Sequence, residues 1–156
     1  KYLSPALCFV NTNEVDIKVT NEIVQFTKDS IVKVSFGKKS SFQDYWNLAS
    51  ITLLSGILFR RLQRLEILSS DPEHDNLIRG TLEKHLIVVS ICDNIMGNIS
   101  KRRVAKSETL ISDSELGFLN DLVSNLKDVL SWCPVNELYR AIIDLQKFLN
   151  KVERSR

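Results

Sequence analysis

Two long stretches of the chain carry apolar residues at helical spacing, and only a few residues separate them. The first runs from Ser40 to about Leu68 and is apolar over much of its helical circumference, which is typical of a central, buried helix. The second runs from Asp71 to Ile99. It begins with an aspartate N-cap, a proline at the first helical position and an acid in the first turn. Because the connection is short, we expect the two helices to be antiparallel neighbours.

The segment before this pair permits two interpretations. Its apolar residues between 15 and 19 alternate as in a strand, but between 15 and 26 they also recur at helical spacing. No second strand pattern exists to pair with an isolated strand. We therefore expect helices at about 14–28 and 31–36, the latter ended by Gly37. A further short segment opens with Ser4-Pro5 and runs through Val10.

Capping signals mark the other helices. Ser40 with Gln43 forms one predicted capping box, and Ser112 with Glu115 forms another. The helix after Ser112 should run until Cys133-Pro134, because proline stops a helix and can begin the next one. The last helix then spans about 138–152, and residues 98–111 form the one long loop. The aromatic residues at 42, 45 and 46 are expected mostly in the core, as are those of the last two helices.

This pattern predicts an all-α fold, an antiparallel bundle of about six to seven helices. At 156 residues the chain fits a single domain, residues 1–156, and its beginning without a methionine suggests a domain excised from a longer protein. No apolar run is long enough to span a bilayer, so we expect no membrane contact. A net charge of +2 does not indicate a dedicated nucleic-acid-binding domain.

The sequence offers little for chemistry. Three widely spaced cysteines, at 8, 92 and 133, cannot form a complete disulfide framework, which favours reduced, buried thiols in an intracellular protein. His74 and His85 have no ligand-type residues at metal-binding spacing, and neither is placed beside a nucleophile and an orienting group. The glycines are scattered, so no phosphate loop exists. We expect no enzyme activity, no metal and no cofactor.

The most marked local charge feature is a basic run within the predicted loop. It consists of Lys101, Arg102, Arg103 and Lys106. Such a run could contact phosphate or an acidic partner, or act as a nuclear-import signal, but short charge runs are usually solvated. The run also lacks the interleaved aromatic residues of single-strand binders.

Two segments together resemble the telomere repeat factor homology (TRFH) domain. Phe59–Ile95 is similar to the third and fourth helices of that family, in which a helix with a basic end leads through an acidic linker into a helix starting with a Leu-Glu pair, here Leu82-Glu83. Gly117–Leu149 is similar to the next helical hairpin of the family. A divergent fungal member would fit, since Glu73 and His74 stand where vertebrate members carry an aromatic residue.

The resemblance implies a role in recruiting proteins. TRFH domains are helical modules of telomeric double-stranded DNA-binding proteins; they homodimerise and dock short peptides of partner proteins, while a separate domain contacts DNA. By this likeness the chain would act in the nucleus at telomeric chromatin, without contacting DNA itself. The implied peptide groove, between the two long helices, would be lined by Leu54, Leu58, Arg61, Leu62, Ile78 and Leu82.

The sequence therefore predicts a non-enzymatic protein-interaction domain, with two alternatives. One is a helical adaptor subunit of an unrelated chromatin or trafficking complex. The other is direct nucleic-acid binding through the basic run, with an affinity that falls steeply as salt is added. A tryptophan beside a helix end, Trp132, could also serve as a surface anchor for a partner.

Overall fold

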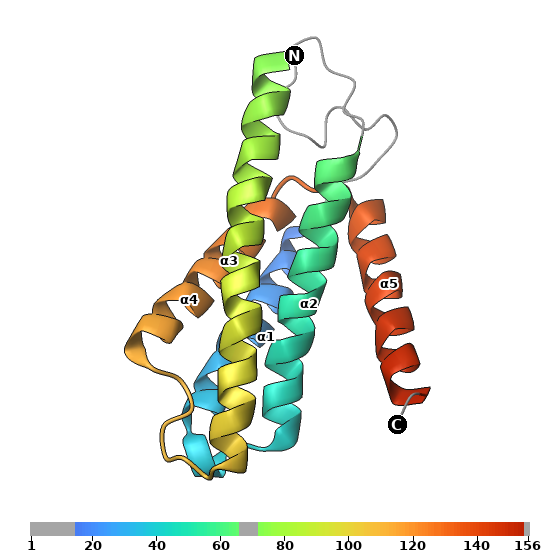
Figure 1. The fold of residues 1–156 in the computed structure, drawn as a ribbon. Helices are drawn as coiled ribbons and strands as arrows, with labels where there is room; N and C mark the ends of the chain where they lie inside the picture. Colours follow the sequence, from blue (N-terminus) through green and yellow to red (C-terminus); the bar gives the residue numbers. More distant parts are fainter. Residues whose placement is uncertain (1–14, 66–71, 155–156) are drawn as a thin grey trace.

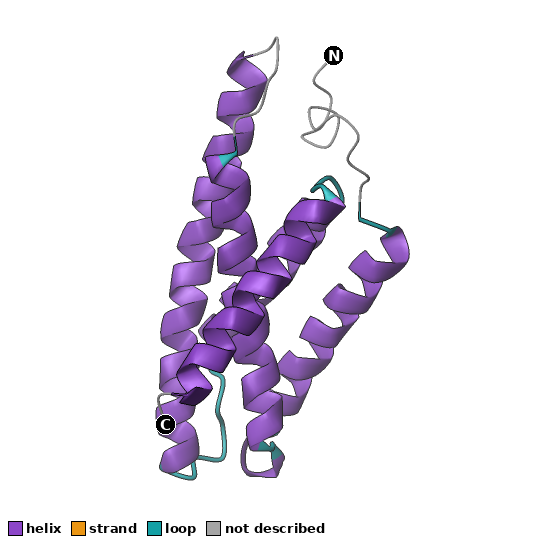
Figure 2. Cartoon of the chain, turned by 90° about the vertical axis from the view of Figure 1, so that its right-hand side faces the viewer, coloured by secondary structure: helices purple, strands orange, loops and turns teal. Residues whose placement is uncertain are grey.

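The computed structural model describes residues 15–65 and 72–154, and within these ranges the chain is helical without strands (Figures 1 and 2). This confirms the all-α prediction. The elements are α1 (Ile17–Ser35), the 3₁₀ turn η2 (Gly37–Lys39), α2 (Phe42–Arg64), α3 (Pro72–Val104), α4 (Asp113–Leu130) and α5 (Val135–Arg154). The described part thus holds five α-helices, fewer than the six to seven expected. The segment predicted at 4–10 lies outside the described residues.

The predicted break between two short helices before Gly37 is wrong, because α1 is continuous. The inward-facing hydroxyls of Thr27 and Ser30 donate to the carbonyls of Ile23 and Phe26, each at 2.8 Å, so these polar side chains are satisfied within the helix. The helical interpretation of residues 15–26 is confirmed from Ile17 onward. The helix also ends where Gly37 predicts, since that glycine adopts the left-handed region with φ of 63°.

The capping box of α2 lies one residue later than predicted. Ser41 accepts from the backbone N–H of Asp44, and the Asp44 carboxylate accepts from the backbone N–H of Ser41 at 2.8 Å. Gln43 instead donates to Asn47. At its other end, α2 stops at Arg64, earlier than the expected Leu68.

The prediction of a long loop at 98–111 is also wrong in its first half, because α3 continues to Val104. Arg102 binds the Glu115 carboxylate at the start of α4, and Arg103 donates to the backbone carbonyl of Ser41 at 3.0 Å. These long-range bonds hold the last turn of α3 in place. The start of α3 at Pro72 agrees with the sequence prediction.

The last two helices follow their local signals more closely. Ser112 and Glu115 form the capping box predicted for α4. That helix ends at Leu130, three residues before Cys133, and a turn leads to Pro134, which directly precedes α5. The thiols of Cys92 and Cys133 are buried and free, as predicted for them, and Cys8 lies outside the described residues.

Successive helices run in opposite directions, and α2 occupies the middle of the assembly (Figure 1). It packs most extensively against α3, confirming the predicted antiparallel pair, and also against α1 and α5. On the far side α4 packs on α1 and α3, whereas α5 is attached chiefly to α2. The core is built from aliphatic side chains around the fully buried Phe59. None of the described helices combines the length and apolarity needed to cross a bilayer.

Candidate docking surface

The side chains expected to line a peptide groove between the two long helices are mostly part of the core. Leu54, Leu58, Leu62 and Leu82 are buried, and Ile78 is half-buried against them. These side chains are therefore part of the packed core of the bundle. A peptide cannot reach the four leucines while the helices remain packed in this way.

Arg61, the expected basic rim of that groove, instead joins α2 to α5. Its guanidinium donates to Glu137 and to Asp144, both at 3.1 Å. Glu137 is buried and also accepts from Arg140 at 3.0 Å. Since a buried carboxylate needs such partners, Arg61 serves to fix α5 on the bundle.

The basic run divides into two kinds of residue. Arg102 and Arg103 are engaged with other elements, Arg102 with Glu115 and the carbonyl of Leu110, and Arg103 with residues at the start of α2. Lys101 and Lys106 are exposed. The run is therefore not a uniform solvated patch, because its arginines tie helix ends together.

A different surface is formed by aromatic residues at the start of α2. The capping box at Ser41 places Phe42 in the first helical position, and the helical repeat then brings Tyr45 and Trp46 beside it. The Phe42 ring is stacked on Trp46 with centroids 6.1 Å apart and lies 6.0 Å from Tyr45. Phe42 is 56% exposed although it is a large apolar side chain.

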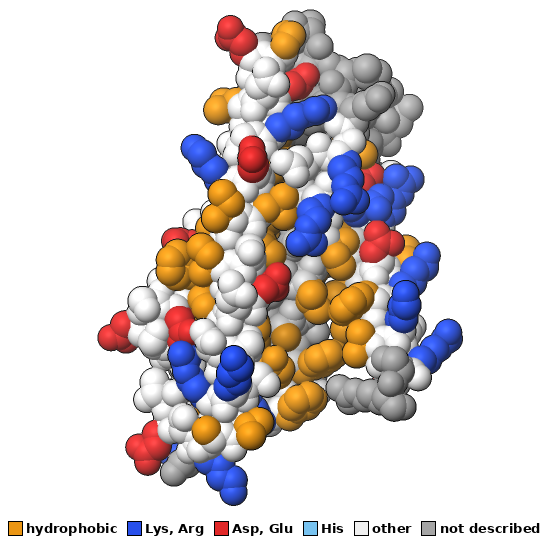
Figure 3. Space-filling model, viewed as in Figure 1, with side chains coloured by type: hydrophobic (Ala, Val, Ile, Leu, Met, Phe, Trp, Pro, Cys, Tyr) orange, Lys and Arg blue, Asp and Glu red, His pale blue; other side chains and the backbone are white. Residues whose placement is uncertain are grey.

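This aromatic group borders a hollow between α2 and the last turns of α5, which we call the aromatic hollow. It has a volume of about 370 Å³ and is lined by Phe42, Gln43, Trp46, Leu149, Val152 and Glu153. Figure 3 shows hydrophobic side chains gathered on this face between the two helices. The volume lies within the range of small-ligand and peptide side-chain pockets.

A second hollow continues from Phe42 to the end of α3, and we call it the bridging hollow. It measures about 260 Å³ and is lined by Phe42, Tyr45, Ser100, Arg103 and Val104. Val104, in the last turn of α3, is among the most exposed apolar side chains. Phe42 is thus shared by two adjoining depressions on one apolar surface.

This surface was not predicted from the sequence, because the aromatic residues at 42, 45 and 46 were expected mostly in the core. One local signal pointed to it. Phe42 directly follows the N-cap and so lies at the very start of its helix, where neighbouring helices cover side chains least. Trp132, the surface anchor considered from sequence, is half-buried and packs against the core.

Several titratable groups of the described residues lie in the interior. Burial lowers the pKa of His85, an effect that Asp128 partly opposes, and the two side chains are 3.7 Å apart, too far for a good hydrogen bond. Burial raises the pKa of both Cys92 and Cys133 to about 12, which keeps them as thiols. Among the described residues no group of potential ligands could hold a metal ion.

Comparison with known proteins adds no relative. No protein-family model matches this chain, and no curated protein or solved structure does so either.

Proposed function

We propose that this chain is a protein-interaction domain that binds a short apolar segment of a partner protein in the aromatic hollow. The observation that carries the proposal is the half-exposed Phe42 stacked on Trp46 at the edge of that hollow. Removal of a large aromatic side chain from water is favourable, so a partner that covers Phe42 would gain binding free energy. Aromatic residues are also frequent among the residues that contribute most to the binding energy of protein interfaces.

A peptide or helix with one or two apolar anchors is the occupant that fits the surface. The hollow is too small for a whole folded face, and its wall is formed by two helices, so a side chain from a partner can enter between them. Gln43 and Glu153 at the lining supply polar groups that can fix the orientation of a bound backbone.

The resemblance to TRFH domains extends this proposal to the identity of the partner. On that basis the partner would be a telomere protein, and the domain would act in the nucleus, either as a monomer or as a homodimer. The docking position would differ from the groove implied by the family pattern, because the four leucines of that groove are buried here.

The proposal is tested by selecting binders from a displayed library of random 12-residue peptides and measuring their affinities by fluorescence anisotropy. Selected peptides should share aromatic or branched aliphatic anchors. Phe42→Ala should weaken their binding about 30-fold, as expected for truncation of an aromatic hot spot worth about 2 kcal/mol. Telomere-protein peptides, measured beside scrambled versions, test the extension to telomeres.

Phe26→Ala is the matched control, because Phe26 is 44% exposed on α1 and lines neither hollow. It should leave peptide affinity unchanged. The proposal fails if no peptide is selected, or if the two variants affect binding equally. Sedimentation of the wild type and of Phe42→Ala measures whether each protein is a monomer or a dimer. A dimer that Phe42→Ala dissociates would mean that a second copy, and not a peptide, occupies the hollow.

A further inference from the structure

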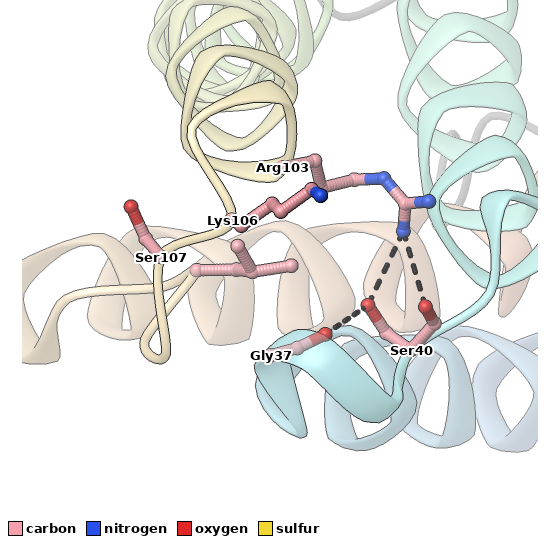
Figure 4. Close-up of a pocket in the computed structure, with 6 residues that line it drawn as sticks. Gly37, Ser40, Arg103, Lys106 and Ser107 are labelled. Atoms are coloured by element: carbon pink, nitrogen blue, oxygen red, sulfur yellow. Dashed lines mark hydrogen bonds between the residues drawn. The ribbon is translucent and has the colours of Figure 1, made fainter.

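A third hollow adjoins the surface just described, and its character is cationic. This basic hollow measures about 400 Å³ and is lined by Gly37, Ser40, Arg103, Lys106, Ser107 and Leu110 (Figure 4). Of the described residues that line it, two are cations, two are hydroxyl residues and none is a carboxylate. A hollow with this lining favours an anion.

Arg103 is held in position with part of its guanidinium unused. Its Nη1 atom donates to the carbonyl of Ser41 at 3.0 Å, to the hydroxyl of Ser40 at 3.2 Å and to the carbonyl of Ser40 at 3.4 Å. The Ser40 hydroxyl in turn donates to the carbonyl of Gly37. All these contacts of Arg103 use one nitrogen, so Nη2 and Nε have no partner among the described residues, on a side chain whose orientation is already fixed.

Lys106 reaches the same hollow because the chain turns back on itself after α3. Its backbone adopts the left-handed region with φ of 56°, and its N–H donates to the carbonyl of Arg103 at 3.0 Å. In Figure 4 the Lys106 side chain extends in the direction of Arg103. The lysine is exposed, and no described carboxylate forms an ion pair with it.

Shared lining residues link the three hollows in series, which defines a path over the surface. Phe42 lines both the aromatic and the bridging hollow, and Arg103 lines both the bridging and the basic hollow. An extended segment lying along this path would place apolar side chains at α5 and α2 and a negative group beyond the end of α3. The surface is therefore complementary to a segment with an apolar end and an anionic end.

We infer that the partner segment carries a phosphorylated serine or threonine whose phosphate enters the basic hollow between Arg103 and Lys106. This inference rests on the proposed function. A phosphate carries about −1.5 to −2 charges and three acceptor oxygens, which match two cations and the nearby hydroxyls, whereas a carboxylate carries a single charge. The guanidinium, held by its bonds to Ser40 and Ser41, keeps its positive charge at the edge of the hollow.

The test uses an oriented peptide library with a central phosphoserine flanked by random positions. Phosphopeptides enriched on the domain should carry an aromatic or aliphatic residue at a constant offset on one side of the phosphoserine. Removal of the phosphate from an enriched peptide should weaken binding at least about tenfold, as for the loss of charge-assisted hydrogen bonds. Replacement of the phosphoserine by glutamate should restore little of that affinity.

Lys106→Asn and Lys101→Asn form the matched pair of variants. Both remove one positive charge from an exposed lysine, asparagine tolerates the left-handed backbone at 106, and Lys101 lines none of the three hollows. Lys106→Asn should weaken the phosphopeptide about fivefold or more and leave the dephosphorylated peptide unaffected. Lys101→Asn should change neither affinity by as much as twofold.

The outcomes separate this inference from the proposed function. If peptides bind in a manner that depends on Phe42 but not on phosphate or Lys106, the phosphate inference is overturned and the docking function stands. Equal binding of the glutamate and phosphoserine peptides also overturns it. If neither phosphorylated nor unphosphorylated peptides bind, both proposals fail.

Discussion

At the scale of single residues, Gly37 is the position where the fold depends most on the absence of a side chain. Its φ of 63° is unfavourable for other residues, and an added Cβ would lie 1.8 Å from the backbone oxygen of Glu108. We expect Gly37→Ala to lower the free energy of unfolding by about 2–4 kcal/mol, through strain and overlap with a neighbouring backbone. Urea denaturation followed by circular dichroism measures this.

Gly97→Ala provides the opposite case. Gly97 lies within α3, and an added Cβ there would meet nothing within 4 Å. Alanine should therefore stabilise the domain by about 0.5–1 kcal/mol, because it favours the helix more than glycine does. Similar effects of both substitutions would show that the close approach of Gly37 to Glu108 does not exist in solution.

The sequence predicted that Gly37 ends a helix, but it did not indicate that Glu108 lies next to this glycine. A glycine after an apolar segment predicts the end of a helix from backbone preferences alone. The approach of Glu108 depends on how the turn after α3 packs beside η2, and those two segments are far apart in the chain. The same limit applies to Arg103, whose partners Ser40 and Ser41 no local pattern indicates.

At the scale of elements, a carboxylate at the start of α4 makes the free energy of unfolding depend on pH. Burial raises the pKa of Glu115, but hydrogen bonds from Arg102, Ser112 and Asn98 outweigh it and lower the pKa from 4.5 to about 2. Because the folded pKa lies below the unfolded one, this stabilisation is complete above about pH 5 and is lost as the pH falls toward 2. We expect a contribution of about 2 kcal/mol, after allowance for solvent screening.

Glu115→Gln removes the titrating group while it retains an acceptor for the cap. Urea titrations between pH 7 and pH 2.5 should show that the variant starts less stable and loses less stability on acidification than the wild type. An equal acid-induced loss in both proteins would mean that other carboxylates account for it. Asp44, whose pKa is lowered by its bonds to Ser41, caps α2 in the same manner.

Helix starts were easier to predict than helix ends. Ser112 with Glu115 is a local signal, because the cap bonds to its own first turn. The start of α3 at Pro72 likewise agrees with the proline predicted at the first helical position. Ser40 with Gln43 was predicted to cap α2, but Ser41 also precedes a suitable residue three positions on, and only the bonds formed decide between the two serines. The end of α3 was missed because Arg102 and Arg103 extend it through partners on α4 and α2.

At the scale of the whole molecule, the central position of α2 predicts an order of local stability. It packs against α1, α3 and α5, whereas α5 is attached chiefly to α2. Segments with fewer packed neighbours open at lower cost. Native-state hydrogen exchange should therefore be at least about tenfold slower for the amides of residues 48–62 than for those of α5, after correction for intrinsic rates. Equal protection would show that α5 and α2 open together.

The all-helical architecture and the α2–α3 pair could be predicted, because long apolar periodicity depends little on tertiary detail. The candidate site could not. Leu58 and Leu62 were expected at a groove, but periodicity cannot distinguish a side chain that fills an interface from one that lines its opening. Phe42 was expected in the core, and its exposure depends on where the last turns of α5 lie.

The attachment of α5 has a mechanical consequence. A tension applied between Ile17 and Arg154 would act first on the seam, the interface between α5 and α2. There Arg61 forms ion pairs with Glu137 and Asp144. Since that seam also forms one wall of the aromatic hollow, peeling α5 away would dismantle the pocket while α1 to α4 stayed packed together. A pulled domain would therefore lose this pocket before the other helices separated.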